Sequence, residues 1–317
     1  SGTESDNLAL LGTSRRLYGS WDFLISAAEH PAVLMQKDAL QALGHRVQIL
    51  PLTPEGLLDL AAAEEALSER TALVSLMQVS NETGAVQPLE ALAGLIRAKA
   101  PQALLHVDGV QGFLRLPMSL RAAHVDLYTL SGHKIHGPKG IGALAVGPRA
   151  KLSPVLFGGG QERGLRSGTE NLPAILGLDE AVRAMNALEN PSASMRRQKL
   201  AIYRALADGI PGLAVNGPAP DSPQAAPHIL NLSLPGIRGE VMVHALEEKG
   251  VLVGTGSACS SKKRKRSEGF ASMNVSNERA DSAVRISLSP LTTDAEIGQA
   301  VEAFQACYAL LKPYQRR

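Results

Sequence analysis

Four residues, Ser131-Gly132-His133-Lys134, directly follow the short apolar run 127–130. We expect this run to form a buried strand, so that the lysine lies where the strand ends. A lysine flanked there by hydroxyl and imidazole groups is placed to form an imine with the aldehyde of a cofactor. An ordinary solvated lysine in a loop is the alternative interpretation.

A carboxylate ends the preceding apolar run, 103–107. Asp108 follows that run directly, and Gln111 follows three residues later. A carboxylate at a strand end would keep the ring nitrogen of a pyridoxal cofactor protonated and so preserve its capacity to accept electrons. Gln111 could then donate a hydrogen bond to the phenolate oxygen. An aspartate in this place is also a common helix N-cap.

Two hydroxyl-containing turns could bind a phosphate. Ser1-Gly2-Thr3 precedes an expected helix at 4–11, and Arg166-Ser167-Gly168-Thr169 precedes an expected helix at 172–187. Free N–H groups and the helix dipole favour anions at a helix N-terminus. Either turn could instead be a simple helix cap.

A cysteine lies among small residues in Thr255-Gly256-Ser257-Ala258-Cys259-Ser260-Ser261. The basic run Lys262–Arg266 follows it, and nearby cations favour the thiolate form of a cysteine. This setting suits a nucleophile, although an incidental free thiol in a loop is the alternative. The second cysteine, Cys307, fits the apolar pattern of the last helix and is predicted to be a small core residue.

The basic run could be a solvated surface, a localisation-like signal, or a contact for RNA or an acidic protein. Aromatic residues make up only 3% of the chain and none interrupts the run, so we favour a solvated surface or a protein partner over direct nucleic-acid binding. His133 and His136 have a spacing that could suggest a metal, but the sequence shows no third ligand, so no metal site is predicted.

Composition indicates an ordinary soluble globular protein. The chain has 317 residues, 44% of them hydrophobic, and a net charge of +2. No apolar stretch approaches the roughly 20 residues that a membrane helix needs. Two cysteines do not form a disulfide framework, so we expect a reducing compartment, the cytoplasm, and no membrane contact.

Apolar runs at 73–77, 103–107, 127–130 and 141–146 alternate with helical patterns such as 89–98, which predicts an α/β fold with a mainly parallel sheet. After residue 190 the pattern changes to helices at 195–209, 239–249 and 293–312 and strands at 229–234 and 284–288. We therefore predict a large domain at 1–190 and a smaller α+β domain at 191–317.

The motifs together resemble the cysteine desulfurases, which are pyridoxal-phosphate enzymes of fold type I related to the class V aminotransferases. The resemblance runs over essentially the whole chain. Its further stretches are Glu29-His30-Pro31-Ala32-Val33, Val79-Ser80-Asn81-Glu82-Thr83-Gly84, His106-Val107-Asp108, Gly256-Ser257-Ala258-Cys259 and Val284-Arg285-Ile286-Ser287. Each motif is weak or moderate alone, and their order and spacing carry the resemblance.

The resemblance implies that pyridoxal 5'-phosphate is bound by Gly2, Thr3, His30, Asn81, Asp108, Gln111, Ser131, His133, Lys134 and Thr169. Within that set, Lys134 would hold the cofactor and His30 would stack on its ring and assist proton transfer. Thr169 would come from the neighbouring subunit of a homodimer. Asn81 and Arg285 would also receive the carboxylate of the substrate, L-cysteine.

The implied reaction converts L-cysteine to L-alanine. Lys134 would move the α-proton, and the Cys259 thiolate would attack the substrate sulfur and become a persulfide. The sulfur would then pass to an acceptor protein in iron–sulfur cluster assembly or tRNA thiolation. The long basic loop after Cys259 suggests an acidic docking surface on that acceptor.

Two other functions stay open at this point: a selenocysteine lyase, and a truncated, non-catalytic partner protein. Family members normally carry several dozen residues ahead of the glycine-threonine turn, whereas this chain opens on Ser1 without an initiator Met. We therefore expect a fragment, a processed chain or a shortened chain, less stable or inactive by itself.

Overall fold

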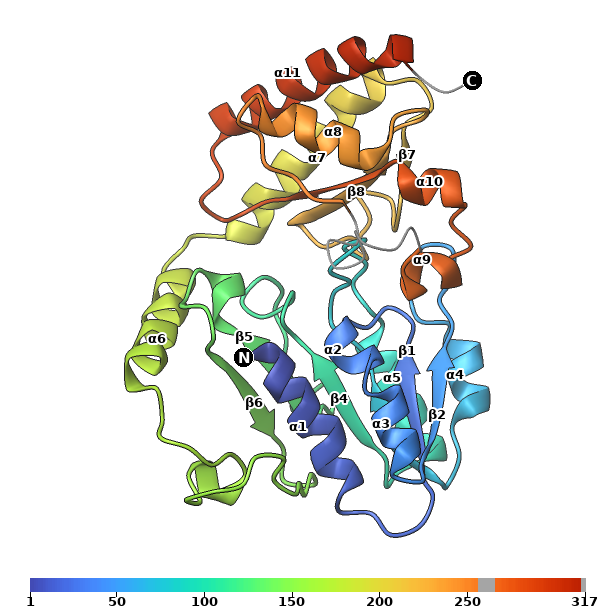
Figure 1. Ribbon diagram of the computed structural model, residues 1–317, viewed down its shortest axis with the longest axis vertical. Helices are drawn as coiled ribbons and strands as arrows, with labels where there is room; N and C mark the ends of the chain where they lie inside the picture. The colour runs from blue at the N-terminus through green and yellow to red at the C-terminus, as the bar shows by residue number, and fades with distance from the viewer. Residues whose placement is uncertain (256–265, 315–317) are drawn as a thin grey trace. The chain divides into compact units, whose positions relative to one another are not determined.

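The computed structural model describes residues 1–255 and 266–314, which divide into two compact units (Figure 1). Unit 1 contains Ser1–Pro51, Leu58–Val79 and Gln87–Glu189. Unit 2 contains Leu52–Leu57, Ser80–Val86 and Asn190–Arg317. Two short segments from the first third of the sequence therefore belong to the second unit.

A six-stranded sheet forms the centre of unit 1. In chain order its strands are β1 (Asp22–Ser26), β2 (Arg46–Leu50), β3 (Thr71–Ser75), β4 (Leu104–Asp108), β5 (Leu127–Ser131) and β6 (Gly142–Val146). The spatial order is β2-β1-β3-β4-β5-β6, and only the β5–β6 pair is antiparallel. The predicted α/β fold with a mainly parallel sheet is confirmed.

Helices cover both faces of this sheet, as Figure 1 shows. They are α1 (Gly2–Ser14), α2 (Pro31–Leu34), α3 (Lys37–Ala42), α4 (Leu60–Ala66), α5 (Leu89–Lys99) and α6 (Leu172–Asn186), with 3₁₀ turns η1 (Gly132–Ile135) and η2 (Glu162–Gly164). Side chains alternate across β1: Phe23 lies in one buried cluster with Leu10 of α1, and Leu24 lies in another with Leu92 of α5. Both faces are apolar because each is buried.

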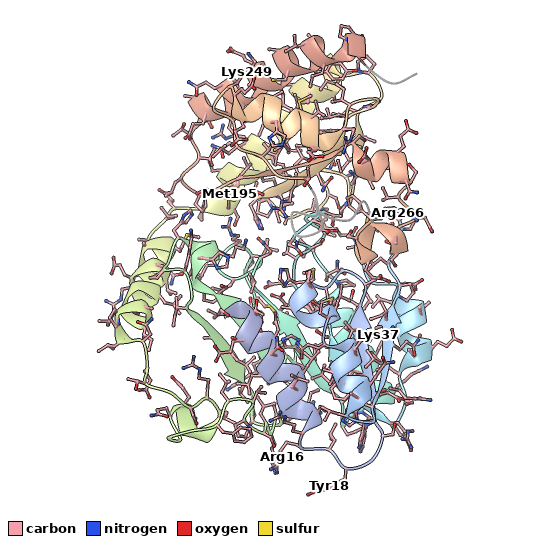
Figure 2. All side chains as sticks on the ribbon, in the orientation of Figure 1. Arg16, Tyr18, Lys37, Met195, Lys249 and Arg266 are labelled. Carbon is pink, nitrogen blue, oxygen red and sulfur yellow. The ribbon has the colours of Figure 1, made fainter. Side chains whose placement is uncertain are left out.

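Unit 2 is built on a three-stranded antiparallel sheet in the order β7-β8-β9. Its elements are α7 (Pro191–Gly209), β7 (Ala214–Val215), β8 (Ile229–Ser233), α8 (Gly239–Glu247), α9 (Glu268–Ser272), α10 (Asn277–Asp281), β9 (Ala283–Ser287), α11 (Asp294–Leu311) and η3 (Lys312–Tyr314). Met195, labelled in Figure 2, is buried in its core together with Leu232 and Phe304. Cys307 is also fully buried there, as the sequence predicted.

The helix boundaries follow local capping signals. The Ser1 hydroxyl accepts the Glu4 N–H at the start of α1. At the start of α11, Thr293 and Glu296 form a reciprocal capping box, which satisfies two backbone donors that have no helical partner. Among the described residues, no helix is long and apolar enough to cross a membrane.

Candidate active site

The polar residues predicted to bind a cofactor meet at the carboxyl ends of parallel strands in unit 1. His30 follows β1, Asp108 is the last residue of β4, and Lys134 lies in η1 directly after β5. Ligands bind at this edge in open parallel sheets because loops from neighbouring strands converge there. The fold therefore brings these three side chains to one edge of the sheet.

Lys134 is held in a tightly bonded turn. His136 ends η1 in the left-handed region, with φ at 66°, and the Gly137 N–H donates to the Gly132 carbonyl at 2.9 Å. Arg115 donates to the Lys134 carbonyl at 2.6 Å. The side chain of Lys134 is half-buried. Burial raises the pKa of Asp108 and lowers that of His30, and the positive charge of Lys134 acts in the lowering direction on both.

Asp108 is buried and forms a local turn. The Val110 N–H donates to its Oδ1 at 2.9 Å, and an irregular turn follows instead of a helix. The helix-cap alternative is therefore wrong. Burial raises the pKa of Asp108 to about 6, while the Val110 hydrogen bond and the Lys134 charge act in the opposite direction. At neutral pH this carboxylate is ionised and lies near a cation.

The phosphate-binding residues predicted from sequence also lie together. Gly2, in the first turn of α1, is so close to Ser131 that an added Cβ would lie 3.3 Å from the Ser131 Cβ. Ser131 Oγ and His133 Nδ1 are hydrogen-bonded at 2.8 Å. The N-terminus of α1 and two side chains that can donate hydrogen bonds thus surround one place that favours an anion.

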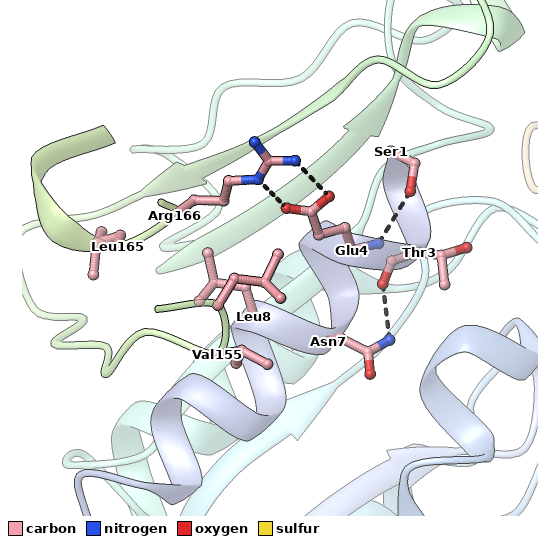
Figure 3. Close-up of a pocket in the computed structure, with 9 residues that line it drawn as sticks. Ser1, Thr3, Glu4, Asn7, Leu8, Val155, Leu165 and Arg166 are labelled. Carbon is pink, nitrogen blue, oxygen red and sulfur yellow. Dashed lines mark hydrogen bonds and ion pairs between the residues drawn. The ribbon is translucent and has the colours of Figure 1, made fainter. Parts of the chain in front are cut away.

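A cavity of about 310 Å³ lies beside the first two turns of α1 (Figure 3). Thr3 contributes to its lining, and Leu8 and Val155 give it an apolar wall. Arg166 donates to Glu4 at 2.6 Å across this cavity, which lowers the pKa of the Glu4 carboxyl. The ion pair connects the loop before α6 to the N-terminus of α1.

Three further predicted residues have simpler surroundings. His30 caps α2, and its Nδ1 accepts the Ala32 N–H at 3.1 Å. Burial and then the Lys134 charge lower the pKa of His30, so its ring is neutral at neutral pH. Gln111 lies in the turn after Asp108. Thr169 is exposed in the loop before α6.

Behind Asp108 lies a buried polar group that the sequence did not reveal. Ser75 Oγ is 2.7 Å from Glu29 Oε1 and 2.9 Å from His106 Nδ1. His106 Nε2 is 3.2 Å from Thr129 Oγ1, and Asp6 of α1 lies at the same end. A signal in the sequence was Glu29 itself, a carboxylate directly before His30 in a stretch of small residues.

The two residues predicted to bind a substrate carboxylate belong to unit 2 and are in contact there. Arg285 on β9 donates to the Asn81 carbonyl at 2.8 Å. The backbone of Arg285 is paired with Gly254 by two hydrogen bonds of 3.0 and 2.6 Å. Asn231 of β8 donates to the Glu82 carbonyl at 3.0 Å, which anchors the turn that contains Asn81.

Cys259 and residues 262–265 of the basic run lie outside the described residues. Arg266, at the end of that run, is exposed and donates to the Val275 carbonyl at 2.6 Å. Within residues 1–255 and 266–314, no cluster of three or more His, Cys, Asp or Glu side chains could hold a metal ion.

The side chains of unit 1 fit a phosphorylated aldehyde with a basic ring nitrogen. Lys134 is an amine able to form an imine, and Asp108 is a buried carboxylate able to pair with a protonated nitrogen. The neutral His30 ring offers an apolar face, and the N-terminus of α1 offers an anion site. Each chemical part of such a group has a matching protein group.

Comparisons with known proteins agree with this chemistry. The sequence model of the family described as class-V aminotransferases matches residues 1–299. A cysteine desulfurase of Gluconacetobacter diazotrophicus is 37% identical over 313 residues, or 98% of this chain and 77% of that protein. Cysteine desulfurase IscS of Rickettsia bellii is 38% identical over 304 residues, or 95% of this chain and 72% of that protein.

Solved structures give the same result. A NifS-like protein superposes with a TM-score of 0.87 at 30% identity, covering 98% of this chain and 81% of that one. DndA from Streptomyces lividans gives a TM-score of 0.74 at 34% identity, covering 90% and 80%. With Lys134 and Asp108 in place at the strand ends, these matches show that the chain belongs to the class-V aminotransferases and, within them, to the cysteine desulfurases.

Proposed function

We propose that this cysteine desulfurase binds pyridoxal 5'-phosphate in unit 1 through Lys134 and Asp108. The observation that carries the proposal is the pairing of β4 and β5: Asp108 ends β4 opposite Thr129, and the half-buried Lys134 lies in η1 directly after β5. Gly2, Thr3, Ser131 and His133 would hold the phosphate. The short Gly2–Ser131 approach and the Ser131–His133 hydrogen bond support that assignment.

The cofactor, when bound, supplies an electron sink for the bond-breaking steps. Asp108 keeps a proton on the ring nitrogen, because an ionised carboxylate stabilises the protonated base beside it. Lys134 carries the proton removed from the α-carbon of the substrate. His30 stacks against the ring and assists proton transfer, Gln111 binds the phenolate oxygen, Asn81 adds a polar contact, and Thr169 serves the neighbouring subunit.

L-cysteine is the substrate, and its carboxylate would bind Arg285 and Asn81. A guanidinium pairs well with a carboxylate because it presents parallel N–H donors in a fixed geometry. The Cys259 thiolate then attacks the substrate sulfur. A sulfur–sulfur bond forms, the carbon–sulfur bond breaks, and the carbon takes a proton, so that alanine leaves and a persulfide stays on Cys259.

The first test is a visible spectrum of the purified chain before and after L-cysteine is added, with alanine assayed in parallel. We expect a yellow cofactor band that is absent from Lys134→Ala. Alanine should form with the unchanged chain and with Cys307→Ala, but not with Cys259→Ala. A chain that stays colourless after pyridoxal phosphate is added would overturn the cofactor proposal.

The sulfur would pass from Cys259 to an acceptor protein of iron–sulfur cluster assembly or tRNA thiolation in the cytoplasm. The basic run Lys262–Arg266 supports an acidic acceptor surface. Neutralising the run should slow sulfur transfer to an acidic acceptor and leave alanine formation unchanged. Unchanged transfer to every acceptor tested would refute the docking role.

The enzyme would work as a homodimer. Two leucines of α6, Leu172 and Leu176, are 59% and 58% exposed, and a subunit interface commonly covers apolar surface of this kind. Thr169, which would serve the neighbouring subunit, lies in the loop just before α6. Light scattering after gel filtration should give twice the chain mass, 66.8 kDa from 33.4 kDa per chain, whereas a single-chain mass would refute the dimer.

A further inference from the structure

Five buried side chains form a continuous hydrogen-bonded line in unit 1. The line runs from Glu29 to Ser75, His106, Thr129 and Asp6, and none of these residues is more than 4% exposed. The successive distances are 2.7, 2.9 and 3.2 Å from Glu29 as far as Thr129. Thr129 is hydrogen-bonded to Asp6, whose Oδ1 lies 3.6 Å from His106 Nε2. The five residues come from α1, β3, β4, β5 and the loop after β1, so tertiary packing alone creates the line.

The number of hydrogens limits how this line can be charged. Ser75 and Thr129 each have one hydroxyl hydrogen, and a neutral imidazole has one N–H. If His106 carries its hydrogen on Nδ1, it donates to Ser75, and Thr129 donates to Nε2. Thr129 then has no hydrogen left for Asp6, so the Asp6 carboxyl must be protonated and donate to Thr129.

The other tautomer requires the opposite arrangement. If His106 carries its hydrogen on Nε2, it donates to Thr129, and Ser75 donates to Nδ1. The Glu29 carboxyl must then be protonated and donate to Ser75, while Thr129 donates to Asp6. Both carboxyls can be ionised together only if His106 is a cation, and complete burial lowers the pKa of His106 to about 3.

We propose that Asp6 and Glu29 are positioning residues that hold at least one proton between them, placed according to the tautomer of His106, so that at most one negative charge lies in the line behind Asp108. Moving the proton requires no other reactant. It leaves Glu29, passes through Ser75, His106 and Thr129, and arrives on Asp6, and the net charge is unchanged.

Limiting the negative charge in this line affects the ionisation of Asp108, and this part rests on the proposed function. Burial, and then the Asp108 charge, raise the pKa of Asp6 to about 8 and that of Glu29 well above its usual value. Asp108 differs from both in that the charge of a cation, Lys134, acts on it and lowers its pKa against burial, together with the Val110 N–H at its carboxylate. Tyr128, the other titratable side chain affected by Asp108, stays neutral because burial raises its pKa. Ionisation is thereby concentrated on the residue that pairs with the ring nitrogen.

The tautomer of His106 can be read by ¹⁵N NMR of the full chain labelled at histidine, with the signal assigned through His106→Gln. Ser75→Ala removes the partner of Nδ1 and should shift the ratio toward the Nε2–H form. Thr129→Val removes the partner of Nε2 and should shift it toward Nδ1–H. Each shift should be about two- to tenfold, since one hydrogen bond is lost. Ser26→Ala, a buried serine outside the line, should change nothing.

Three results would overturn the proposal. One is a His106 cation between pH 6 and 8 in the unchanged chain, which needs no variant to fold. Another is the same tautomer ratio in Ser75→Ala and Thr129→Val. The third comes from ¹³C-labelled aspartate and glutamate, if the Asp6 and Glu29 carboxyls both titrate below Asp108. None of these measurements requires turnover, so an inactive chain with the expected tautomers would reject the proposed function and leave this inference standing.

Discussion

The buried carboxyl of Asp6 makes the stability of unit 1 depend on pH. Burial and the nearby Asp108 raise the pKa of Asp6 to about 8 in the folded chain. An unfolded aspartate titrates near ~3.9. Between these values the folded chain holds a proton that the unfolded chain has released. The contribution of Asp6 to stability is therefore fully present below the unfolded pKa, and it is lost as the pH rises from there through the folded pKa.

Asp6→Asn should remove this dependence. Within that window the free energy of unfolding changes by about 1.36 kcal/mol per pH unit for each proton that the folded chain binds and the unfolded chain does not. Between about pH 5.5 and about pH 7.5 the unchanged chain should therefore lose about 3 kcal/mol relative to Asp6→Asn. Asparagine keeps the size of the side chain and cannot ionise, so it retains the packing of α1.

Urea unfolding at several pH values would measure this difference. The single tryptophan, Trp21, lies directly before β1 in unit 1, and its Nε1 donates to the Tyr18 carbonyl at 3.0 Å. Its fluorescence therefore reports the unfolding of unit 1, and linear extrapolation gives the free energy in water. The chain is measured without cofactor so that no ring cation lies beside Asp108.

Asp22→Asn is the matched control. Arg46 donates to both carboxylate oxygens of Asp22 at 2.7 Å and holds its pKa below the usual value. Asp22 is therefore ionised in the folded and the unfolded chain throughout the window, and its replacement should cost the same free energy at each pH. The reasoning would be refuted if the stability difference between Asp6→Asn and the unchanged chain were also independent of pH.

Three further predictions concern packing, substrate binding and a buried lysine. Gly109→Ala should destabilise unit 1 by about 1–3 kcal/mol or more in urea unfolding, because the added Cβ would lie 1.9 Å from Tyr128 Cζ. As a control, Gly94→Ala adds a Cβ in open space on α5 and should stabilise the chain by up to about 1 kcal/mol. Arg285→Lys should raise the KM for L-cysteine about tenfold or more with a smaller effect on kcat, because a bidentate contact is lost; an unchanged KM would remove Arg285 from the carboxylate site. Lys199 donates from Nζ to the Ala226 carbonyl at 2.7 Å, and burial lowers its pKa to about 8. Between about pH 8 and about pH 10 the unfolded chain keeps a proton that folded Lys199 has lost, so unit 2 should gain stability as the pH rises. Lys199→Met should abolish that gain in urea titrations.

The strand ends that carry the chemistry could be predicted because their signals are local. The runs before Lys134 and Asp108 are short, mostly apolar and almost fully buried, and polar residues follow each at once. Such a run predicts a strand of a parallel sheet whatever the rest of the fold does. The apolar pattern of the last helix likewise placed Cys307 in the core. Cys259 lies outside the described residues, so its role stays a prediction.

Two strands of the large sheet could not be found in this way. β2, Arg46–Leu50, lies at the edge of the sheet, and Arg46 and Gln48 remain exposed, so its apolar run is broken. β1 begins with Asp22, a charged residue that is buried in the fold, where Arg46 pairs with it. The line from Glu29 to Asp6 has the same cause: carboxyls that are polar by sequence become buried when distant elements pack.

The connection between β5 and β6 is the shortest link between paired strands in the large sheet, and it contains Lys134. It spans residues 132–141, whereas β3 and β4 are joined through residues 76–103. The entropy lost in closing a loop rises with its length, and nearby segments therefore pair soonest in a folding chain. The turn that holds the reactive lysine belongs to the part of the sheet with the lowest contact order, so it should be among the first parts of unit 1 to form.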